Sequence, residues 1–356
     1  MKRIKDRWRL LLRTRRAEAR RSRRRTVAYR RRELSQRHVL PRHQGMVIVA
    51  PTEFIIESHL HHDRVAEFLS QLRAAAKSCH ATNRTVVIDF RQTVQMVASA
   101  TLLFFSELQR LRAIFPSLTF GCIPPKHPVV NEVLQHLQIF EMLGYKSSVV
   151  PSRPDVISWR TASSANVDGP QVGSLIETYK SLGSERAKHL FRGVSEAMGN
   201  AVNHAYIAPR NDGLPSPPAE KWWMFCRQDE GKLVVAVCDL GIGIPRSLPL
   251  LYPEEAFMRL LDFGTRGRVR SDASMIEAAM QIRRTRTAKR GRGKGLGDTR
   301  RLVDEVRGGR LVILSNRGEL QYRGGAYLRS NYEQSIKGAV VLWVVPLNGG
   351  SHGESD

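Results

Sequence analysis

Three polar side chains, Glu196, Asn200 and His204, recur every four residues in the stretch VSEAMGNAVNHAY, residues 194–206. On a helix this spacing places them on one face. The amide oxygen of Asn200 suits Mg²⁺ and the carboxylate of Glu196 can accept a proton, so this face could meet a metal-bound phosphate. An ordinary solvent-facing helix stripe is the competing interpretation of this motif alone.

A second motif, LVVAVCDLGIGIP at residues 233–245, is an apolar strand that ends in the lone acid Asp239. A carboxylate at the end of a buried strand needs a partner, and the exocyclic amine of adenine would provide one. Gly241 and Gly243 let the backbone approach a flat base or open a turn. An Asp-capped turn after a strand is the alternative.

The third motif, GRGKGLGDTRRLVDEV at residues 291–306, carries alternating glycines into a periodic helix. Free backbone N–H groups at a helix N-terminus attract phosphate. The motif is not a Walker A loop, because Gly295 follows Lys294 where Ser or Thr is required. It is not a Rossmann fingerprint either, because no strand precedes it.

In this order the three motifs resemble the N box, DxGxG and GxGLG elements of the GHKL ATPase superfamily, which includes histidine kinases, Hsp90-type chaperones, gyrase B and MutL. VSEAMGNAVNHAY most resembles the anti-sigma-factor serine kinases of bacteria. FMRLLDFGTRGR, residues 257–268, resembles the glycine–threonine segment before the lid of that group. The resemblance covers roughly residues 169–347 and implies a GHKL (Bergerat) α/β sandwich domain.

The resemblance also implies ATP and Mg²⁺ as ligands. Asn200 would hold Mg²⁺, Asp239 would bind the adenine amine, and Glu196 matches the general-base position. Residues of the two glycine motifs would complete the nucleotide-binding set: Gly241, Gly243, Gly293, Lys294, Gly295, Leu296 and Gly297.

Apolar periodicity predicts the elements that must position these residues. For the second half of the chain we expect helices over 183–204 and from about 296, and strands over 222–226, 233–238, 310–314 and 339–345. Residues 151–168 have the composition of a linker, and 348–356 that of a tail. We expect one ring of the Trp222–Trp223 pair in the core.

Alternating strands and helices predict an α/β domain over residues 46–150. The expected strands are 46–50, 85–90 and 118–123, and the expected helices are 64–76, 98–114 and 129–143. The stretch 85–111 resembles the STAS domain of anti-sigma-factor antagonists. Their phospho-accepting Asp–Ser pair falls on Val97 and Ala98 here, so the acceptor is missing, although Ser99 is adjacent. The resemblance therefore favours a docking role over a phospho-switch.

Three histidines and an acid, His59, His61, His62 and Asp63, cluster just before the expected helix 64–76. Such a cluster could bind a metal ion, but no further Cys or His completes a ligand set. We therefore interpret it as a solvated helix start.

The net charge of +24 over 356 residues is unevenly placed. Residues 1–45 hold 18 Lys and Arg against 3 acids, and residues 259–310 hold 15 against 6. The first segment is an arginine-rich arm that could bind nucleic acid or an anionic surface, or be a solvated tail. No stretch approaches the ~18 apolar residues of a membrane span, and the scattered cysteines fit a reducing, cytoplasmic compartment.

These features predict an Mg-ATP-binding regulatory protein, a serine/threonine protein kinase or ATPase of partner-switching type. A STAS-like or sigma-factor-like regulator is its expected protein partner, and a homodimer is one option for its assembly. Two alternatives stay open: a non-catalytic ATP sensor, and an ATP-gated nucleic-acid binder that uses the arm.

Overall fold

The computed structural model describes residues 45–177, 183–229, 231–252, 271–285 and 297–347. Its contacts divide the chain into residues 1–45 and a compact unit over 46–356. Apart from Gly45, the predicted arm lies outside the described residues, as does the predicted tail. None of the described helices is both long enough and apolar enough to cross a membrane.

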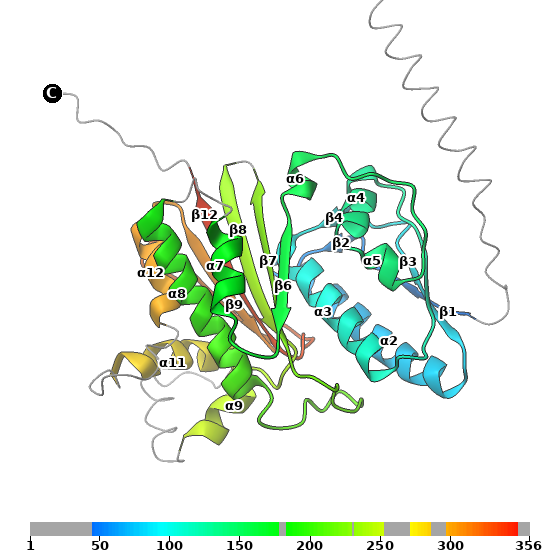
Figure 1. The fold of residues 1–356 in the computed structure, drawn as a ribbon. Coiled ribbons are helices and arrows are strands. Elements are labelled where there is room, and N and C mark those ends of the chain that lie inside the picture. Colours follow the sequence, from blue (N-terminus) through cyan, green and yellow to red (C-terminus); the bar gives the residue numbers. More distant parts are fainter. Residues whose placement is uncertain (1–44, 178–182, 230, 253–270, 286–296, 348–356) are drawn as a thin grey trace, which may run out of the picture. The chain divides into compact units, whose positions relative to one another are not determined.

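A seven-stranded sheet, antiparallel throughout, forms one half of the compact unit (Figure 1). Its strand order is β11-β10-β9-β12-β8-β7-β6. The strands are β6 (Arg160–Ser164), β7 (Trp222–Asp229), β8 (Lys232–Asp239), β9 (Arg310–Ser315), β10 (Gly318–Arg323), β11 (Ala326–Asn331) and β12 (Ala339–Pro346). β12 follows all the others in the chain and yet lies in the middle of the sheet.

Helices cover one face of this sheet (Figure 1). The helices of this half are α6 (Pro154–Ile157), α7 (Gly169–Glu177), α8 (Ser184–Asn200), a π-helical turn η2 (Ala201–Ala205), α9 (Ile244–Leu251), α11 (Asp272–Thr285) and α12 (Gly297–Glu305). Of the elements that sequence periodicity did not predict, β6 and α6 lie in the segment with linker composition.

The other half of the unit is a smaller α/β layer. A three-stranded sheet has the order β1-β3-β5, and β2 pairs with β4. The elements are β1 (Gly45–Val49), β2 (Glu53–Phe54), α2 (His62–Ala81), β3 (Thr85–Asp89), β4 (Gln95–Met96), α3 (Ala98–Ile114), β5 (Phe120–Ile123), α4 (Pro128–His136) and α5 (Ile139–Met142). The helix expected over 129–143 is broken in two, because Gln138 adopts a left-handed φ of 58°.

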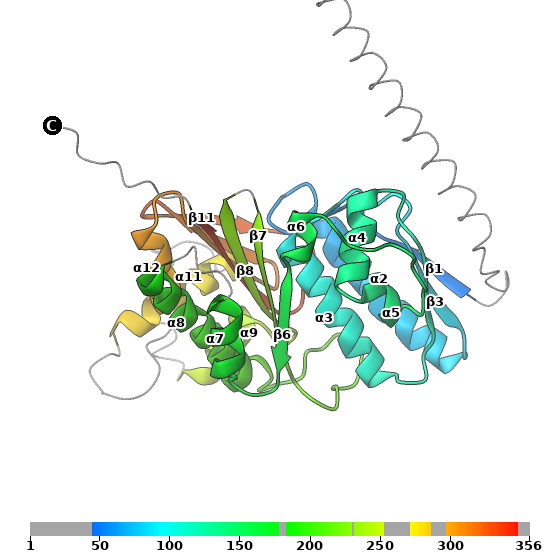
Figure 2. The ribbon, with the colours of Figure 1, turned by 45° about the horizontal axis from the view of Figure 1, so that its top comes forward.

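Helix α3 packs directly on β7 and β8, on the face that α8 and α12 leave uncovered (Figure 2). Along β7, Trp222 and Met224 therefore join the core under α8, whereas Trp223 and Phe225 join the core under α3. Both tryptophans are buried, not one. Because both sheet faces are buried, these strands read as continuous apolar runs although the sheet is antiparallel.

A buried ion cluster joins the two halves. The carboxylate of Glu107, on α3, accepts hydrogen bonds from Arg73 on α2, from Arg110, and from Arg210 of the second half at 2.8–3.1 Å. Asp212 accepts from both Arg110 and Arg210 at 2.7 and 3.0 Å. Burial alone would raise the pKa of Glu107, but the three arginines outweigh it and hold the pKa well below the usual range.

The expectation of a solvated helix start at the histidine cluster is wrong for His62. This side chain is fully buried, and its ring stacks on Tyr332 at a centroid distance of 3.6 Å. Its Nδ1 lies 2.9 Å from the carbonyl oxygen of Ile56. Burial lowers the pKa of His62, so the ring serves as a neutral packing group between the two halves.

Candidate functional site

The end of α8 carries the polar stripe predicted from the sequence. The helix expected over 183–204 is α-helical only to Asn200 and continues as the π-helical turn η2. Turns of this wider kind are rare and often lie at functional sites. Here the turn leaves Asn200 and His204 on the wall of the same pocket.

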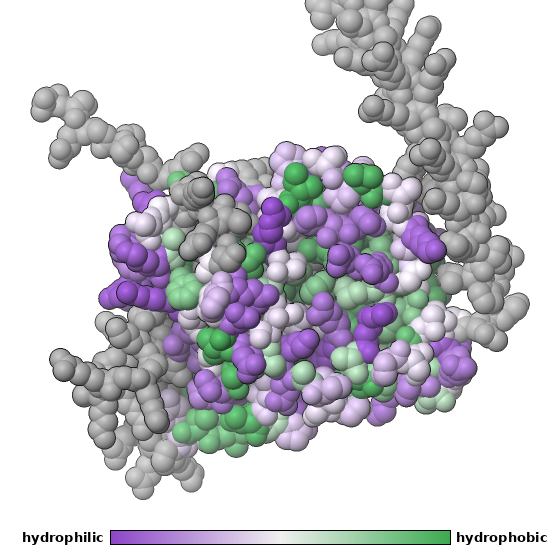
Figure 3. Space-filling model, in the orientation of Figure 1, coloured by the Kyte–Doolittle hydropathy of each residue, from purple (hydrophilic) through white to green (hydrophobic). Residues whose placement is uncertain are grey.

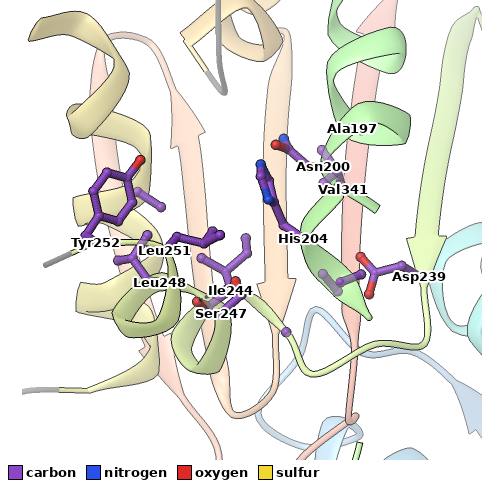
Figure 4. A pocket seen from close by; sticks show the side chains of 14 residues that line it. Ala197, Asn200, His204, Asp239, Ile244, Ser247, Leu248, Leu251, Tyr252 and Val341 are labelled. Carbon is purple, nitrogen blue, oxygen red and sulfur yellow. Dashed lines mark hydrogen bonds between the residues drawn. The ribbon is translucent and has the colours of Figure 1, made fainter. Parts of the chain in front are cut away.

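That pocket opens between η2, the end of β8 and helix α9 (Figure 4). In Figure 4 Asn200 and His204 point into the space between Asp239 and the apolar side chains of Leu248, Leu251 and Tyr252. About 690 Å³ of the pocket, including its mouth, is free of atoms. Apolar walls with a few convergent polar groups are typical of sites for flat organic ligands.

Asp239 is the acid of this pocket. It ends β8 and lies in register between Trp222 on β7 and Ala339 on β12, so the sheet fixes its position. Its Oδ1 accepts a hydrogen bond of 3.0 Å from the Gly241 N–H. Burial raises the pKa of Asp239 to about 6, although that hydrogen bond and the charge of Arg210 both lower it. An ionised carboxylate has about four acceptor positions, so Asp239 can accept a further donor beside the backbone N–H groups of Gly241 and Ala339.

Gly241 and Gly243 serve the packing of the loop that follows Asp239. A Cβ at Gly241 would lie 2.1 Å from the carbonyl oxygen of Ala205, which itself accepts a hydrogen bond of 2.7 Å from the Ile242 N–H. Gly243 has a φ of +79°, and a Cβ there would meet the Asn316 side chain at 2.6 Å. The two glycines therefore let the loop backbone pack closely against η2 and against Asn316, which follows β9. The close approach is a contact between the loop backbone and other residues of the protein.

Asn200 carries an unpaired polar atom. Among the described residues its buried Nδ2 has no hydrogen-bond partner. Buried amides are almost always paired, so such an atom is expected to meet a ligand. The amide can also be turned by 180°, which presents the oxygen to the same space and suits a metal ion. Asn200 can therefore present either a hydrogen-bond donor or an oxygen acceptor to a ligand in this pocket.

Glu196 lies one turn before Asn200 on α8 but does not line the pocket. The pocket begins beside the C-terminal end of the helix, and Glu196 is half-buried further back. The structure thus brings together Asn200, His204 and Asp239, and leaves the predicted base outside the wall.

The third motif is described only from Gly297, where α12 begins. Gly293, Lys294, Gly295 and Leu296 lie outside the described residues, as does the segment 257–268. Helix α12 itself packs against α8 and the sheet. The Trp343 Nε1–H donates a hydrogen bond of 2.7 Å to the Thr299 carbonyl oxygen and so fixes the first turn of the helix.

Sequence motifs did not indicate the apolar wall of the pocket. Ile244, Ser247, Leu248 and Tyr252 come from α9 or follow it directly, and Ala279 comes from α11. The stretch IPRSLPLL contains two prolines, which hid its helical character. The surface beside it is also apolar: Leu250 is 61% exposed, and hydrophobic surface gathers there at the lower edge of Figure 3.

The position equivalent to a phospho-acceptor is also described. Helix α3 begins at Ala98, and Ser99 in its first turn is 1% exposed. Its hydroxyl donates a hydrogen bond of 2.6 Å to Oε1 of Glu57. Ser99 is therefore not accessible to a kinase in this state.

A comparison with protein-family models finds no match to this chain, and a comparison with curated proteins finds no relative.

Proposed function

We propose that this chain is an Mg-ATP-binding regulatory protein, in which residues 169–347 form a GHKL-type nucleotide site and residues 46–150 a STAS-like docking module. The leading activity is that of a serine/threonine protein kinase or ATPase of partner-switching type. A STAS-like or sigma-factor-like regulator in the cytoplasm is the proposed partner. The observation that supports this most is the convergence of Asp239 and the unpaired amide of Asn200 on one apolar-walled pocket.

Each side chain of the pocket has a task that its surroundings permit. The ionised carboxylate of Asp239 would accept a hydrogen bond from the adenine amine, and the apolar side chains of α9 would cover the faces of the base. The amide of Asn200 would hold Mg²⁺, which supplies charge neutralisation at the phosphates. Glu196, which lies outside the pocket wall, holds the base position that the resemblance implies, and there it would take a proton from water or from a protein hydroxyl.

The test is a nucleotide titration of the full chain with three variants. D239A should abolish ATP binding, because the pocket offers no substitute for the carboxylate. N200A should weaken Mg-ATP more than metal-free ATP. D155N, which changes a half-exposed carboxylate on α6 that does not line the pocket, should bind like the parent. If both D239A and N200A bind ATP with the affinity of the parent, the proposed nucleotide site is wrong.

A non-catalytic ATP sensor is the second candidate, and the position of Glu196 outside the pocket wall favours it. The discriminating variant is E196Q. An enzyme would keep its ATP affinity and lose turnover by ~10²–10⁴-fold. A sensor would show no turnover in the parent and no effect of E196Q on binding. The arm 1–45 could add nucleic-acid or anionic-surface binding, which should weaken steeply with salt.

A further inference from the structure

The loop after β8 also contributes to a second hollow, and this one is polar. Gly241 and Ile242 form part of its wall, and four cationic side chains converge on it: Arg210, Arg246, Arg317 and Lys337. Asp272 is the one carboxylate among its lining residues. About 590 Å³ of the hollow is free of atoms, including its mouth, which is far more than a small ion needs.

The cations come from separate segments of the chain. Arg246 lies on α9, Arg317 in the turn between β9 and β10, and Lys337 in the connection between β11 and β12. These three segments each connect two strands of the sheet: β8 to β9 through α9, β9 to β10, and β11 to β12. The sheet thus holds three positive side chains around one hollow. Cations that are held close together repel one another, and an anion bound between them offsets this repulsion. The convergence of these side chains therefore favours an anion as the ligand.

Most of this charge is not balanced within the protein. In the part of the chain that the structure describes, the Arg317 guanidinium has no partner, and Arg246 donates only to the carbonyl oxygens of Arg210 and Pro209. The Asp272 carboxylate is already engaged by the Arg317 backbone N–H at 2.9 Å. Only Arg210 is fully compensated, through Glu107 and Asp212.

The pKa of Lys337 reflects this excess of positive charge. Burial lowers the pKa of its ammonium group, and the charges of Arg73 and Arg210 lower it further. Its Nζ donates a hydrogen bond of 3.2 Å to the Asn211 carbonyl oxygen, which leaves two N–H donors. The hydroxyl of Ser335 accepts from the Lys337 backbone N–H at 3.1 Å and keeps its own proton to donate.

We propose that this hollow binds a phosphate-type dianion, held by Arg246, Arg317, Lys337 and the Ser335 hydroxyl. Guanidinium forks match tetrahedral oxyanions, and an ammonium group adds a point charge. The site is separate from the candidate nucleotide pocket, and its occupation does not depend on ATP.

The experiment titrates inorganic phosphate into the full chain by calorimetry in about 150 mM NaCl, close to physiological ionic strength. Two exposed arginines of the same sheet form a matched pair: Arg317 lines the hollow, and Arg323, at the end of β10, does not. R317Q should weaken phosphate binding by about tenfold, whereas R323Q should leave it unchanged. Because the arm and other basic segments also attract phosphate, this difference between the variants is the readout.

Two sources of such a dianion are separated by a second titration. A phosphoserine peptide that binds ten times more tightly than inorganic phosphate, and loses that advantage in R317Q, identifies a modified protein as the ligand. Equal affinities identify a free phosphate compound. Equal phosphate binding by R317Q, R323Q and the parent overturns the proposal. R317Q should keep the ATP affinity of the parent, so failure here and failure of the nucleotide site are distinguishable.

Discussion

The carboxyl group of Asp239 titrates close to neutral pH because burial raises its pKa to about 6. In the proposed complex only the ionised form accepts a hydrogen bond from the adenine amine. Protons and ATP therefore compete for this residue.

Lowering the pH from 7 to 5 should weaken ATP binding by about tenfold, since a group with a pKa near 6 is mostly ionised at the first pH and mostly protonated at the second. Calorimetry between pH 5 and 8 measures this. His204 shares the pocket wall, so D239N is the control: it should bind weakly, without the decrease below pH 6. A flat profile in the parent would exclude the carboxylate as the contact.

The same pKa affects stability. Because the folded-state pKa lies above the ordinary aspartate value of 3.8, the native protein binds more protons than the unfolded chain between about pH 3.8 and 6. Stability contributed by this group therefore falls as the pH rises through that window and stays low above it.

D239N should raise the melting temperature at pH 7.5 by a few degrees while it weakens ATP binding, because the amide keeps the acceptor for the Gly241 N–H without a charge to bury. Thermal unfolding followed by circular dichroism measures the shift. D155N, at an exposed ion pair, should show none. A lower melting temperature for D239N would mean that the charge stabilises the fold.

Sequence spacing placed Asn200 and Asp239 in the site, because each lies at the end of a strongly patterned element. It could not place Glu196, since whether a helix residue meets a pocket depends on where along the helix the pocket begins. The four basic residues that converge on the second hollow carried no local signal: they are far apart in the chain, and only the sheet brings them together.

At the scale of elements, the loop after β8 is held against η2 by a backbone contact that leaves no room for a side chain. Gly241 is the residue at that contact, whereas Gly199, in the last turn of α8, has no atom of another described residue within 4 Å of its Cβ position apart from its own helix and chain neighbours. The two glycines therefore provide a matched comparison.

G241A should destabilise the protein by about 1–3 kcal/mol, because the added Cβ forces the loop away from the Ala205 carbonyl oxygen. G199A should stabilise it by about 0.5–1 kcal/mol, since the helix gains a better helix former without a clash. Urea unfolding measures both changes. Similar values for the two variants would contradict the close approach.

Elements with strong apolar periodicity were predicted well, and α3 has the predicted bounds of 98–114. Three of the missed elements have weaker patterns. β11 is exposed along most of its length, β6 is short and polar, and α9 contains prolines. Tertiary contacts with the neighbouring strands, not local preference, make the first two into strands.

At the scale of the whole molecule, Glu107 is the carboxylate on which both halves depend. Removal of one partner from a buried ion cluster leaves uncompensated charge, which typically costs about 3–5 kcal/mol. Its pKa is held below the usual range, so the stability that it contributes is present above the ordinary pKa of a glutamate and is lost in strong acid.

E107Q should therefore destabilise the protein by about 3–5 kcal/mol at pH 7, because Arg73, Arg110 and Arg210 keep their charges in a dry environment. E185Q, which breaks an exposed pair with Lys188, should change stability by less than about 1 kcal/mol. Equilibrium unfolding in urea compares them. Equal effects would show that the cluster is hydrated in solution.

The position of β12 governs the order in which the molecule can be assembled on the ribosome. The strand aligns Ala339 with Asp239 and lies between β8 and β9, so the central hydrogen bonds of the sheet cannot form until residue 346 has left the exit tunnel. Until then β8 and the face of α3 have no complete partner. A nascent chain with about 330 residues outside the tunnel should accordingly be bound by chaperones and sensitive to protease, and emergence of roughly twenty further residues should protect the whole unit at once.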